Sequence, residues 1–351
     1  MYSFRNDYSE GAHPNILNAL IQNNNTQEEG YGLDKHTQNA IAALRNLIGD
    51  ANGSVHLLSS GTQTNLIAIS SFLRPHEACI TATSGHIAVH ETGAIEATGH
   101  KLLTVNSSDG KISPQLIEPV LTAHHFEHMV KPRLVYISNP TELGTIYSKH
   151  ELQELSDYCQ RKNLLLYADG ARLGAALVCK GADVTLEDMY KLTDAFYIGG
   201  TKIGTLFGEA LIIRTPHLAA DIRFLIKQRG GLLAKGRVLG TQFEELFKDN
   251  LYFDLARHGN DMAQFMVEEL AEEGCAFWID SPTNQIFPIM DNRIIEDLEG
   301  QFQFYIWAKT DENHSAIRLV TSWATSEEAV RSFVSTYKKV RKAGQDLLVT
   351  A

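Results

Sequence analysis

Short apolar runs alternate with longer stretches of helical pattern along most of the chain. Several of the short runs are apolar at every position, which is typical of strands covered on both faces of a sheet. The longer stretches repeat their apolar residues at helical spacing and predict helices. The predicted strands are residues 55–59, 78–81, 101–105, 133–138, 163–168, 195–198 and 206–213, and the predicted helices are residues 38–48, 63–72, 87–97, 114–123 and 149–162.

The pattern changes beyond about Ala234, where a long helical stretch precedes a few strands and a final helix. We therefore expect an α/β protein with two domains. The large domain, residues 1–238, would hold a mainly parallel seven-stranded sheet flanked by helices, and residues 239–351 would form a small α+β domain. The predicted elements of the small domain are helices through 243–247 and 261–273, strands at 285–290, 303–308 and 317–322, and a helix at 326–343.

Composition limits the classes of protein that fit. Of the 351 residues, 44% are hydrophobic and 21% are charged, as in an ordinary globular protein. A net charge of −11 argues against nucleic acid or a membrane surface as the main partner. The four cysteines are far apart, so we expect free thiols, no disulfide framework and no metal site. Without a secretory signal or a run of about 18 apolar residues, we expect a cytoplasmic protein.

Lys202 is the first candidate for chemistry, because it lies between two apolar runs and beside Gly199, Gly200 and Gly204. Small neighbours let a bulky group approach the amine closely. Apolar surroundings lower the pKa of an amine and make it a nucleophile toward carbonyls. Taken alone, the same pattern also fits an ordinary lysine in a loop between strands.

Asp169 ends a predicted strand, and Arg172 follows three residues later. In an open α/β sheet such a carboxylate lies at the carboxyl edge, where it can hold a protonated ring nitrogen. The arginine offers bidentate geometry for a substrate carboxylate. A structural Asp–Arg pair is the alternative interpretation.

Ser60, Gly61 and Thr62 form a turn between a strand and a helix, and their amides and hydroxyls could hold a phosphate at the helix N-terminus. Taken alone, the motif also fits an ordinary capped helix start. His86 also follows a strand and could stack on a flat cofactor or act as a helix cap. The basic tract at residues 227–237, with Lys235, could close over a phosphate or be a solvated loop.

Arg318 places a charge inside an otherwise apolar strand. A buried charge needs a partner, so this arginine either meets an acidic side chain or reaches a site. A phosphate cradle, a ring-nitrogen carboxylate, a stacking imidazole, a Schiff-base lysine and carboxylate-binding arginines together match pyridoxal phosphate with an amino-acid substrate.

The order of these motifs resembles the threonine aldolase and β-eliminating lyase family of pyridoxal-phosphate enzymes, of the aspartate-aminotransferase fold type (fold type I). The resemblance covers nearly the whole chain, and Lys202 falls at the family's Schiff-base lysine. The other matching segments are Arg5-Asn6-Asp7, Tyr31-Gly32-Leu33-Asp34, Ser60-Gly61-Thr62 with Asn65-Leu66, His86-Ile87 with Glu91, Asp169-Gly170-Ala171-Arg172-Leu173 and Arg318-Leu319-Val320-Thr321.

The resemblance implies roles for individual residues and an assembly of two or four identical subunits, in which Tyr31 could serve a neighbouring site. The implied catalytic residues are Lys202, His86 and Asp169; the cofactor-binding residues are Ser60, Gly61, Thr62, His86, Asp169, Arg172, Lys202 and Lys235; the substrate-binding residues are Asn6, Tyr31, Arg172 and Arg318.

The chain departs from the family around the substrate. Asn6 stands where the aldolases carry a serine, and His90 stands where they carry a tyrosine. The segment Asn139-Pro140-Thr141-Glu142-Leu143 replaces a Thr-His-Asn segment, and the basic residues after Lys227 are spaced differently. The cofactor is therefore better specified than the amino acid.

The predicted function is retro-aldol cleavage of β-hydroxy-α-amino acids such as L-threonine or L-allo-threonine to glycine and an aldehyde. Elimination from another β-substituted amino acid is the main alternative, and a catalytically silent binding protein of the same fold is a second. A nucleotide-binding oxidoreductase would need a G-x-G-x-x-G turn, but residues 59–65 hold a single glycine. His86 and one of His124, His125 and His128 are open candidates for the base at the β-hydroxyl.

Overall fold

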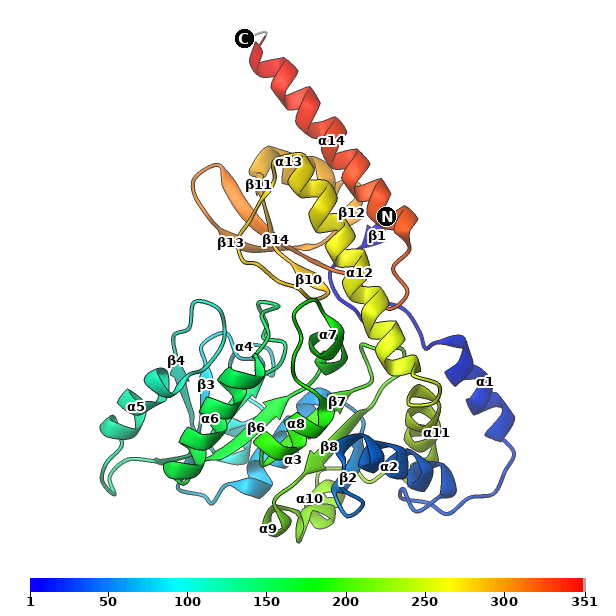
Figure 1. The fold of residues 1–351 in the computed structure, drawn as a ribbon, viewed down its shortest axis with the longest axis vertical. Helices are drawn as coiled ribbons and strands as arrows, with labels where there is room; N and C mark the ends of the chain where they lie inside the picture. Colours follow the sequence, from blue (N-terminus) through cyan, green and yellow to red (C-terminus); the bar gives the residue numbers. More distant parts are fainter. Residues whose placement is uncertain (350–351) are drawn as a thin grey trace.

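The computed structural model describes residues 1–349 and contains a central seven-stranded sheet of order β2-β8-β7-β6-β5-β3-β4 (Figure 1). All pairs are parallel except the two that involve β8. The mainly parallel seven-stranded sheet is thereby confirmed. β8 is antiparallel because the short β7–β8 connection has no room for a crossover helix. The strands are β2 Ser54–Leu58, β3 Glu77–Ala82, β4 Leu102–Val105, β5 Lys131–Ser138, β6 Leu165–Asp169, β7 Ala195–Gly199 and β8 Glu209–Ile213.

Helices cover both faces of this sheet, as its apolar strands predict. Alternate residues of β5 enter different cores: Val135 and Ile137 pack in one, Leu134 and Tyr136 in the other. The first core also takes apolar residues from α2, α5 and α6, and the second takes them from α3 and α10. The helices of this region are α1 Pro14–Asn23, α2 Lys35–Ile48, α3 Gly61–Phe72, α4 His86–Val89, α5 Pro114–Ala123, α6 Lys149–Arg161, α7 Leu173–Val178, α8 Leu186–Leu192, α9 Pro216–Ala219 and α10 Ile222–Gln228.

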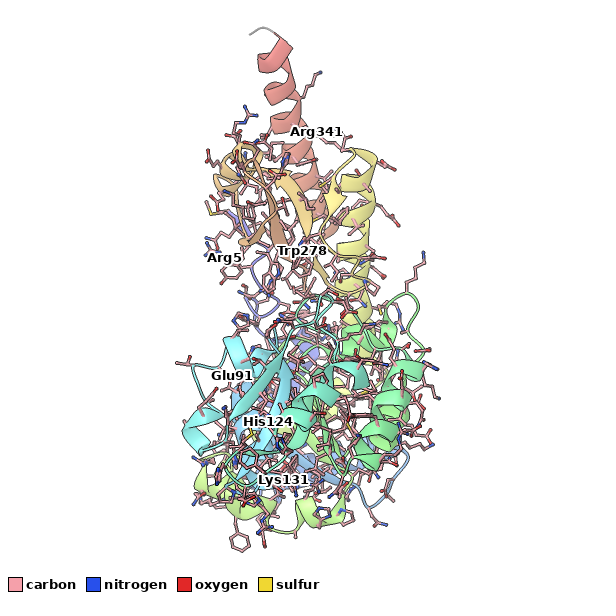
Figure 2. The ribbon with its side chains drawn as sticks, turned by 90° about the vertical axis from the view of Figure 1, so that its left-hand side faces the viewer. Arg5, Glu91, His124, Lys131, Trp278 and Arg341 are labelled. Carbon is pink, nitrogen blue, oxygen red and sulfur yellow. The ribbon has the colours of Figure 1, made fainter. Side chains whose placement is uncertain are left out.

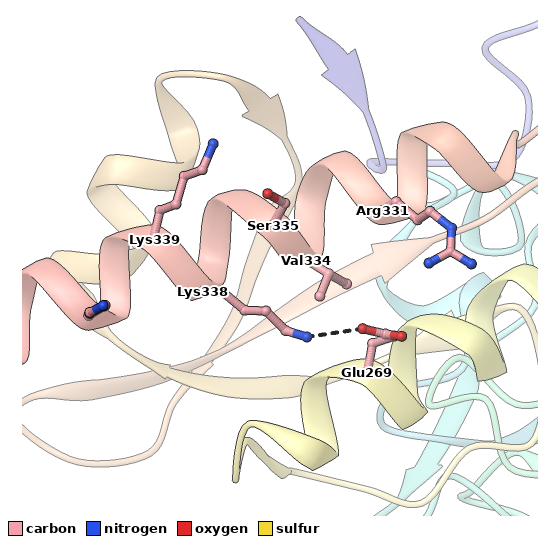
Figure 3. A pocket seen from close by; sticks show the side chains of 7 residues that line it. Glu269, Arg331, Val334, Ser335, Lys338 and Lys339 are labelled. Carbon is pink, nitrogen blue, oxygen red and sulfur yellow. Dashed lines mark hydrogen bonds and ion pairs between the residues drawn. The ribbon is translucent and has the colours of Figure 1, made fainter.

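The helix α11, Arg237–Leu246, still packs against α1 and α2 beside the main sheet, and α12 begins there too. The rest of the chain forms a smaller α+β region above the main sheet, with α14 projecting from it (Figure 1). A small sheet of order β10-β14-β11-β9, with β13 also paired to β14, packs against long helices. Lys338 of α14 reaches Glu269 of α12 at 3.1 Å across a groove between the two helices (Figure 3). The elements are α11 Arg237–Leu246, α12 Leu251–Glu272, β9 Ala276–Phe277, β10 Gln285–Ile286, β11 Pro288–Asp291, α13 Asn292–Glu299, β12 Phe302–Gln303, β13 Tyr305–Lys309, β14 His314–Val320 and α14 Glu327–Val349.

The N-terminus also packs with this C-terminal region. β1, Tyr2–Ser3, pairs in parallel with β12, and Phe4 is fully buried in the C-terminal core. The division at residue 238 stays a prediction, and the N-terminal strand contributes to the C-terminal core.

Some predicted elements differ from the observed ones. The predicted helix 87–97 is wrong: α4 ends at Val89, and only a 3₁₀ turn, Glu96–Thr98, follows. Thr92 (φ 52°) and Gly93 (φ 71°) adopt left-handed backbone between them, which interrupts a helix. The predicted strands 285–290 and 303–308 are each split in two. The elements that were not predicted are the helices α1, α7, α8, α9, α10 and α13 and the two-residue strands β1 and β9.

The structure also bears on the expectations about membrane spans and disulfides. No helix in residues 1–349 is both long enough and apolar enough to span a membrane. All four cysteines are buried and unpaired.

Candidate active site

The predicted site residues follow strands that end at one edge of the seven-stranded sheet. β2 and β7 both pair antiparallel with β8, so β2 runs in the direction of the parallel strands. Ser60 follows β2, His86 follows β3, Asp169 ends β6 and Lys202 follows β7. The carboxyl ends of these strands meet at the edge where open α/β sheets place their sites.

Asp169 is buried at this edge and accepts four hydrogen bonds. Its Oδ1 accepts from the Tyr197 hydroxyl (2.5 Å) and a backbone amide (2.9 Å), and its Oδ2 accepts from the Tyr136 hydroxyl (2.5 Å) and the Asn65 amide (3.0 Å). Burial alone would raise the pKa of this carboxyl, but nearby His86 and the three side-chain donors hold it below its ordinary value. Asp169 therefore stays negatively charged at neutral pH.

His86 is fixed next to Asp169 by two carboxylates. Its Nδ1 lies 2.7 Å from Oε1 of buried Glu91, which also accepts from the Asn65 amide at 2.7 Å. Its backbone amide donates to Oε1 of Glu142 (2.8 Å), an oxygen that also accepts from the Ser138 hydroxyl (2.7 Å). Burial raises the pKa of Glu142. These bonds fix the imidazole in one orientation and leave its Nε2 side for chemistry.

Ligand-type atoms of His86, Glu91 and Asp169 all lie within 4.8 Å of one another. Such a cluster can hold a metal ion, but here hydrogen bonds account for its geometry. Asp169 already accepts four bonds, and Glu91 pairs with the imidazole. The expectation of no metal site stays a prediction.

Lys202 is half-buried on the loop between β7 and β8, with its Nζ 5.9 Å from the centre of the Tyr8 ring. Burial and the Arg172 charge lower the pKa of its amine to about 8, although Asp7 and Asp169 oppose the shift. A fraction of the amine is therefore neutral near physiological pH, as a nucleophile toward carbonyls requires.

The glycines beside Lys202 have a different purpose from the one predicted. A Cβ at Gly199 would come within 2.3 Å of the Ala171 carbonyl oxygen, and Gly204 has φ +92° and faces Leu255. These glycines let the β7–β8 loop pack closely against its own protein. Space for a ligand at the amine does not explain them.

Arg172 forms a buried bidentate ion pair. Its Nε and Nη2 donate to the two carboxylate oxygens of Asp7 at 2.6 and 3.0 Å, and the Asn284 amide donates to the same carboxylate at 2.9 Å. Burial alone would raise the pKa of Asp7, but Arg172 and Lys202 hold it below its ordinary value. Arg172 is thus a structural partner of Asp7 and also lines the cavity that Lys202 lines.

Arg318 has no acidic partner within ion-pair distance among residues 1–343. Its guanidinium carbon lies 5.0 Å from the Trp307 ring centre and 5.7 Å from that of Tyr305, and its Nη2 donates to the Arg5 carbonyl. Its buried Nε has no hydrogen-bond partner in the described part of the chain. Burial, then the charge of Arg172, lower its pKa to about 10. The group is a cation held ready for an anion.

The Asn6 side chain, predicted to bind substrate, makes hydrogen bonds within its own N-terminal segment. Its side-chain oxygen accepts from the Tyr8 amide and the Ser9 hydroxyl, both at 3.0 Å. This local turn presents the exposed Tyr8 ring toward Lys202. The amide therefore shapes the N-terminal segment as well as any contact it makes with substrate.

Tyr31 and Lys235 are exposed and have no described contact with Lys202. The Tyr31 amide donates to the Ala234 carbonyl, and the Tyr31 ring lies under the Lys227 amine (4.5 Å). The loop that carries Lys235 packs near the Ser60 turn, because the Gln63 amide donates to the Arg229 carbonyl at 3.2 Å. The phosphate turn and this basic loop are thus neighbours.

The histidine cluster at residues 124–128 lies away from the site. It follows α5 and precedes Lys131, the amino end of β5, whereas the site lies at the carboxyl end (Figure 2). Figure 2 places His124 and Lys131 well below Glu91. Of the two candidates for the base, only His86 lies at the site.

The buried site groups that were not predicted include Glu209 as well as Tyr136 and Tyr197, which donate to Asp169. Glu209 opens β8 opposite Gly199 and accepts hydrogen bonds from the loop that carries Lys202. The available signal for Glu209 was the one that identified Arg318, a charged residue inside an apolar strand.

Sequence and structure comparisons agree on the family. Residues 4–293 match the β-eliminating lyase family. The chain is similar to a low specificity L-threonine aldolase of Pseudomonas sp. (strain NCIMB 10558), with 31% identity over 97% of this chain and 98% of that protein. A second such aldolase, from Pseudomonas aeruginosa, is 28% identical over the same shares of both chains. The solved structure of Leishmania major threonine aldolase is 48% identical, with a TM-score of 0.95 over 97% of this chain and 99% of that one.

This chain belongs to the β-eliminating lyase family, among pyridoxal-phosphate-dependent carbon–carbon lyases of fold type I. A Thermus thermophilus aspartate aminotransferase, 14% identical over 97% of this chain and 91% of that one, shares the fold with a TM-score of 0.71. The predicted fold class, enzyme class and cofactor are confirmed.

The residues at the sheet edge also fit pyridoxal phosphate. Asp169 offers a buried charge that suits a protonated ring nitrogen, and Lys202 offers an amine of lowered pKa. Ser60 and Thr62 lie at the N-terminus of the 12-residue α3, where amides and hydroxyls suit a phosphate.

Proposed function

We propose that this chain cleaves β-hydroxy-α-amino acids such as L-threonine and L-allo-threonine to glycine and an aldehyde. The observation that carries the proposal is the junction of three groups: the Lys202 amine and the charged Asp169 at the sheet edge, and the unpaired Arg318 cation of β14, which is close enough to feel the charges of Arg172 and Asp7. Together they provide for a carbonyl cofactor, its ring nitrogen and a substrate carboxylate.

Different residues would bind different parts of the cofactor. Ser60, Gly61 and Thr62 would bind the phosphate, with Lys235 on the neighbouring loop, and Asp169 would hold the ring nitrogen. Gly61 packs tightly here, since a Cβ would lie 3.1 Å from the Tyr197 hydroxyl that donates to Asp169. When bound, pyridoxal phosphate supplies an electron sink for a bond broken at the substrate Cα.

Arg318 would bind the substrate carboxylate through its free guanidinium edge, flanked by Tyr305 and Trp307. Arg172 would add a second positive charge, because its pairing with Asp7 uses Nε and Nη2 and leaves Nη1. A fixed carboxylate decides which bond at Cα is broken. Asn6 would act near the same carboxylate.

His86 would accept the proton of the substrate β-hydroxyl. Glu91 holds Nδ1, so Nε2 is the nitrogen free to take a proton. Loss of that proton lets the Cα–Cβ bond break: the Cβ oxygen becomes the aldehyde carbonyl, and Cα gains a proton to give glycine. Glu142, which accepts a hydrogen bond from the His86 backbone amide, would help to hold this histidine in position.

Elimination from a β-substituted amino acid would use the same residues but break the Cα–H bond. A catalytically silent binding protein would do neither. Purified protein incubated with L-threonine, L-allo-threonine and β-substituted amino acids separates the three possibilities by product: glycine with acetaldehyde, an oxo acid, or nothing.

The primary experiment loads the protein with pyridoxal phosphate and treats it with borohydride. We expect a visible absorbance band, its loss on reduction, and a reduced adduct mapped to Lys202 by mass spectrometry. Absence of a band in the wild-type protein, or an adduct on another lysine, contradicts the proposal. Production of acetaldehyde from threonine then tests the substrate.

The proposed setting is a homodimer or homotetramer in the cytoplasm. Exposed Tyr31, beside the loop of Lys235 but with no described contact to Lys202, supports a role at a neighbouring subunit's site. Four unpaired buried thiols suit a reducing compartment. Light scattering and the distribution of the protein in cell fractions test these points.

A further inference from the structure

Glu209 is a buried carboxylate that closes the loop carrying Lys202. It opens β8, where its backbone pairs with Gly199 of β7, and it is 5% exposed. Its Oε1 accepts from the Thr201 hydroxyl at 2.7 Å, and its Oε2 accepts from the Gly200 amide at 3.1 Å. Both donors directly precede Lys202, so this carboxylate sets where the lysine leaves the sheet.

The Thr201 hydroxyl extends the closure to the other end of the loop. It accepts from the Gly208 amide at 3.0 Å, while the Gly200 amide donates to the Gly208 carbonyl at 2.9 Å. Glu209, Thr201 and Gly208 therefore join both ends of the segment that holds Lys202. A neutral side chain could make comparable bonds without the cost of burying a charge.

No lysine, arginine or histidine of residues 1–343 lies within ion-pair distance of Glu209, so no direct partner stabilises its ionised form. Burial raises the pKa of this carboxyl to about 8, and the charge of Lys202 opposes that rise. Where Glu209 is ionised, its charge in turn favours the protonated amine. The other charged or titratable groups near the pair are Asp7, Tyr8, His90, Tyr167, Asp169, Arg172, Tyr197 and Tyr252.

We propose that Glu209 is a positioning residue for Lys202: it anchors the lysine's loop and, through its buried charge, controls when the amine is protonated. The proposal rests on the proposed function, in which the neutral amine captures the cofactor. Asp169 serves the ring nitrogen, and Glu209 serves the lysine itself.

The test measures the amine on cofactor-free protein. Trace labelling with acetic anhydride across pH 6–10, with the Lys202 peptide quantified by mass spectrometry, reports the neutral fraction of this one amine. In Glu209→Gln the protonated amine loses a favourable charge, so we expect the midpoint to fall by about one pH unit. A profile that superimposes on that of the wild type, in folded protein, overturns the proposal.

Glu77→Gln is the matched control, because Glu77 is also a buried carboxylate at a strand start that accepts a backbone amide, that of Arg74 at 2.8 Å. It should leave the Lys202 midpoint unchanged. If Glu209→Gln does not fold, Thr201→Ala decides. This variant removes one hydrogen-bond donor to Glu209, so Glu209 keeps its proton to higher pH. We therefore expect the Lys202 midpoint to fall by less than in Glu209→Gln. An unchanged midpoint overturns the proposal.

The two proposals fail in different ways. A wild-type protein with no reducible adduct at Lys202 refutes the proposed function. The labelling is done on cofactor-free protein, so its midpoints test only the role of Glu209. A wild-type protein that forms the adduct, with equal midpoints in wild type and Glu209→Gln, refutes only Glu209.

Discussion

Arg318 shows how a single side chain can be prepared for a ligand by what it lacks. Its guanidinium is flanked by two aromatic rings and touches a carbonyl, yet forms no ion pair with a carboxylate of residues 1–343. Aromatic faces hold the planar group in place and leave its edge for a carboxylate. The arginine is therefore better explained by a substrate than by the fold.

Arg318→Lys tests this at the level of one residue. A lysine keeps the charge but loses the planar edge and the stacking, so we expect KM for threonine to rise about 10- to 100-fold, from the roughly 1.5–3 kcal/mol of a hydrogen bond to a charged group, with a smaller change in kcat. Steady-state kinetics measure both. Arg331→Lys is the control, since Arg331 also lies over an aromatic ring, Phe265 at 4.8 Å, but on α14. Equal KM values in both variants contradict the role.

Residue types and spacing were enough to predict the groups that carry chemistry, but not their partners. Lys202, Asp169 and Arg318 each stood out in a short local pattern. The pairing of Arg172 with Asp7 joins residues far apart in the sequence, and local pattern contains no information on such a contact. Glu209 carried the same signal as Arg318, although its function depends on the loop that it closes.

At the scale of elements, strands and long helices were predicted well because each depends on its own apolar pattern. The segment after β3 was not. Its helical pattern is overridden because His86 and Glu91 turn toward Asp169 and bond each other, which a continuous helix over residues 87–97 does not allow. The contacts of the site override the helical pattern of this segment, and these contacts cannot be predicted from a single sequence window.

The junction of β6 with the segment after it depends on Gly170. A Cβ here would meet the Tyr197 carbonyl oxygen at 1.8 Å, and the Gly199 amide donates to the Gly170 carbonyl at 2.9 Å. We expect Gly170→Ala to separate β6 from β7 and to lower the free energy of unfolding by about 1–3 kcal/mol. The adjacent Asp169 would shift, so cofactor affinity should also fall.

Urea unfolding and titration with pyridoxal phosphate measure these two effects. Gly11→Ala is the control, because Gly11 has nothing within 4 Å of a built Cβ. Wild-type stability in Gly170→Ala would show that the backbone relaxes without cost and that the close approach is not required.

At the scale of the whole molecule, the N-terminal segment connects the small sheet to the active site. β1 pairs with β12, the Arg5 carbonyl accepts from Arg318, Asp7 pairs with Arg172, and the His13 amide donates to the Gly204 carbonyl at 2.8 Å (Arg5 in Figure 2). The segment of residues 2–13 thus touches both arginines and the Lys202 loop. The C-terminal core and the site are coupled through it.

Phe4→Ala tests this coupling. Phe4 is fully buried, with ring centres 5.5 Å from Phe333 and 6.2 Å from Phe302. Removing the ring should lower the free energy of unfolding by about 3–5 kcal/mol. It should also loosen the Arg5 carbonyl that holds Arg318, so KM for threonine should rise although Phe4 lies outside the site.

Denaturant unfolding and kinetics on the same preparation separate the two effects, at a temperature where the variant remains folded. Phe126→Ala, which removes a ring that is 45% exposed, should change neither. If Phe4→Ala loses stability but keeps the wild-type KM, the segment serves the core alone, and Arg318 is held by its two aromatic rings without help from the N-terminus.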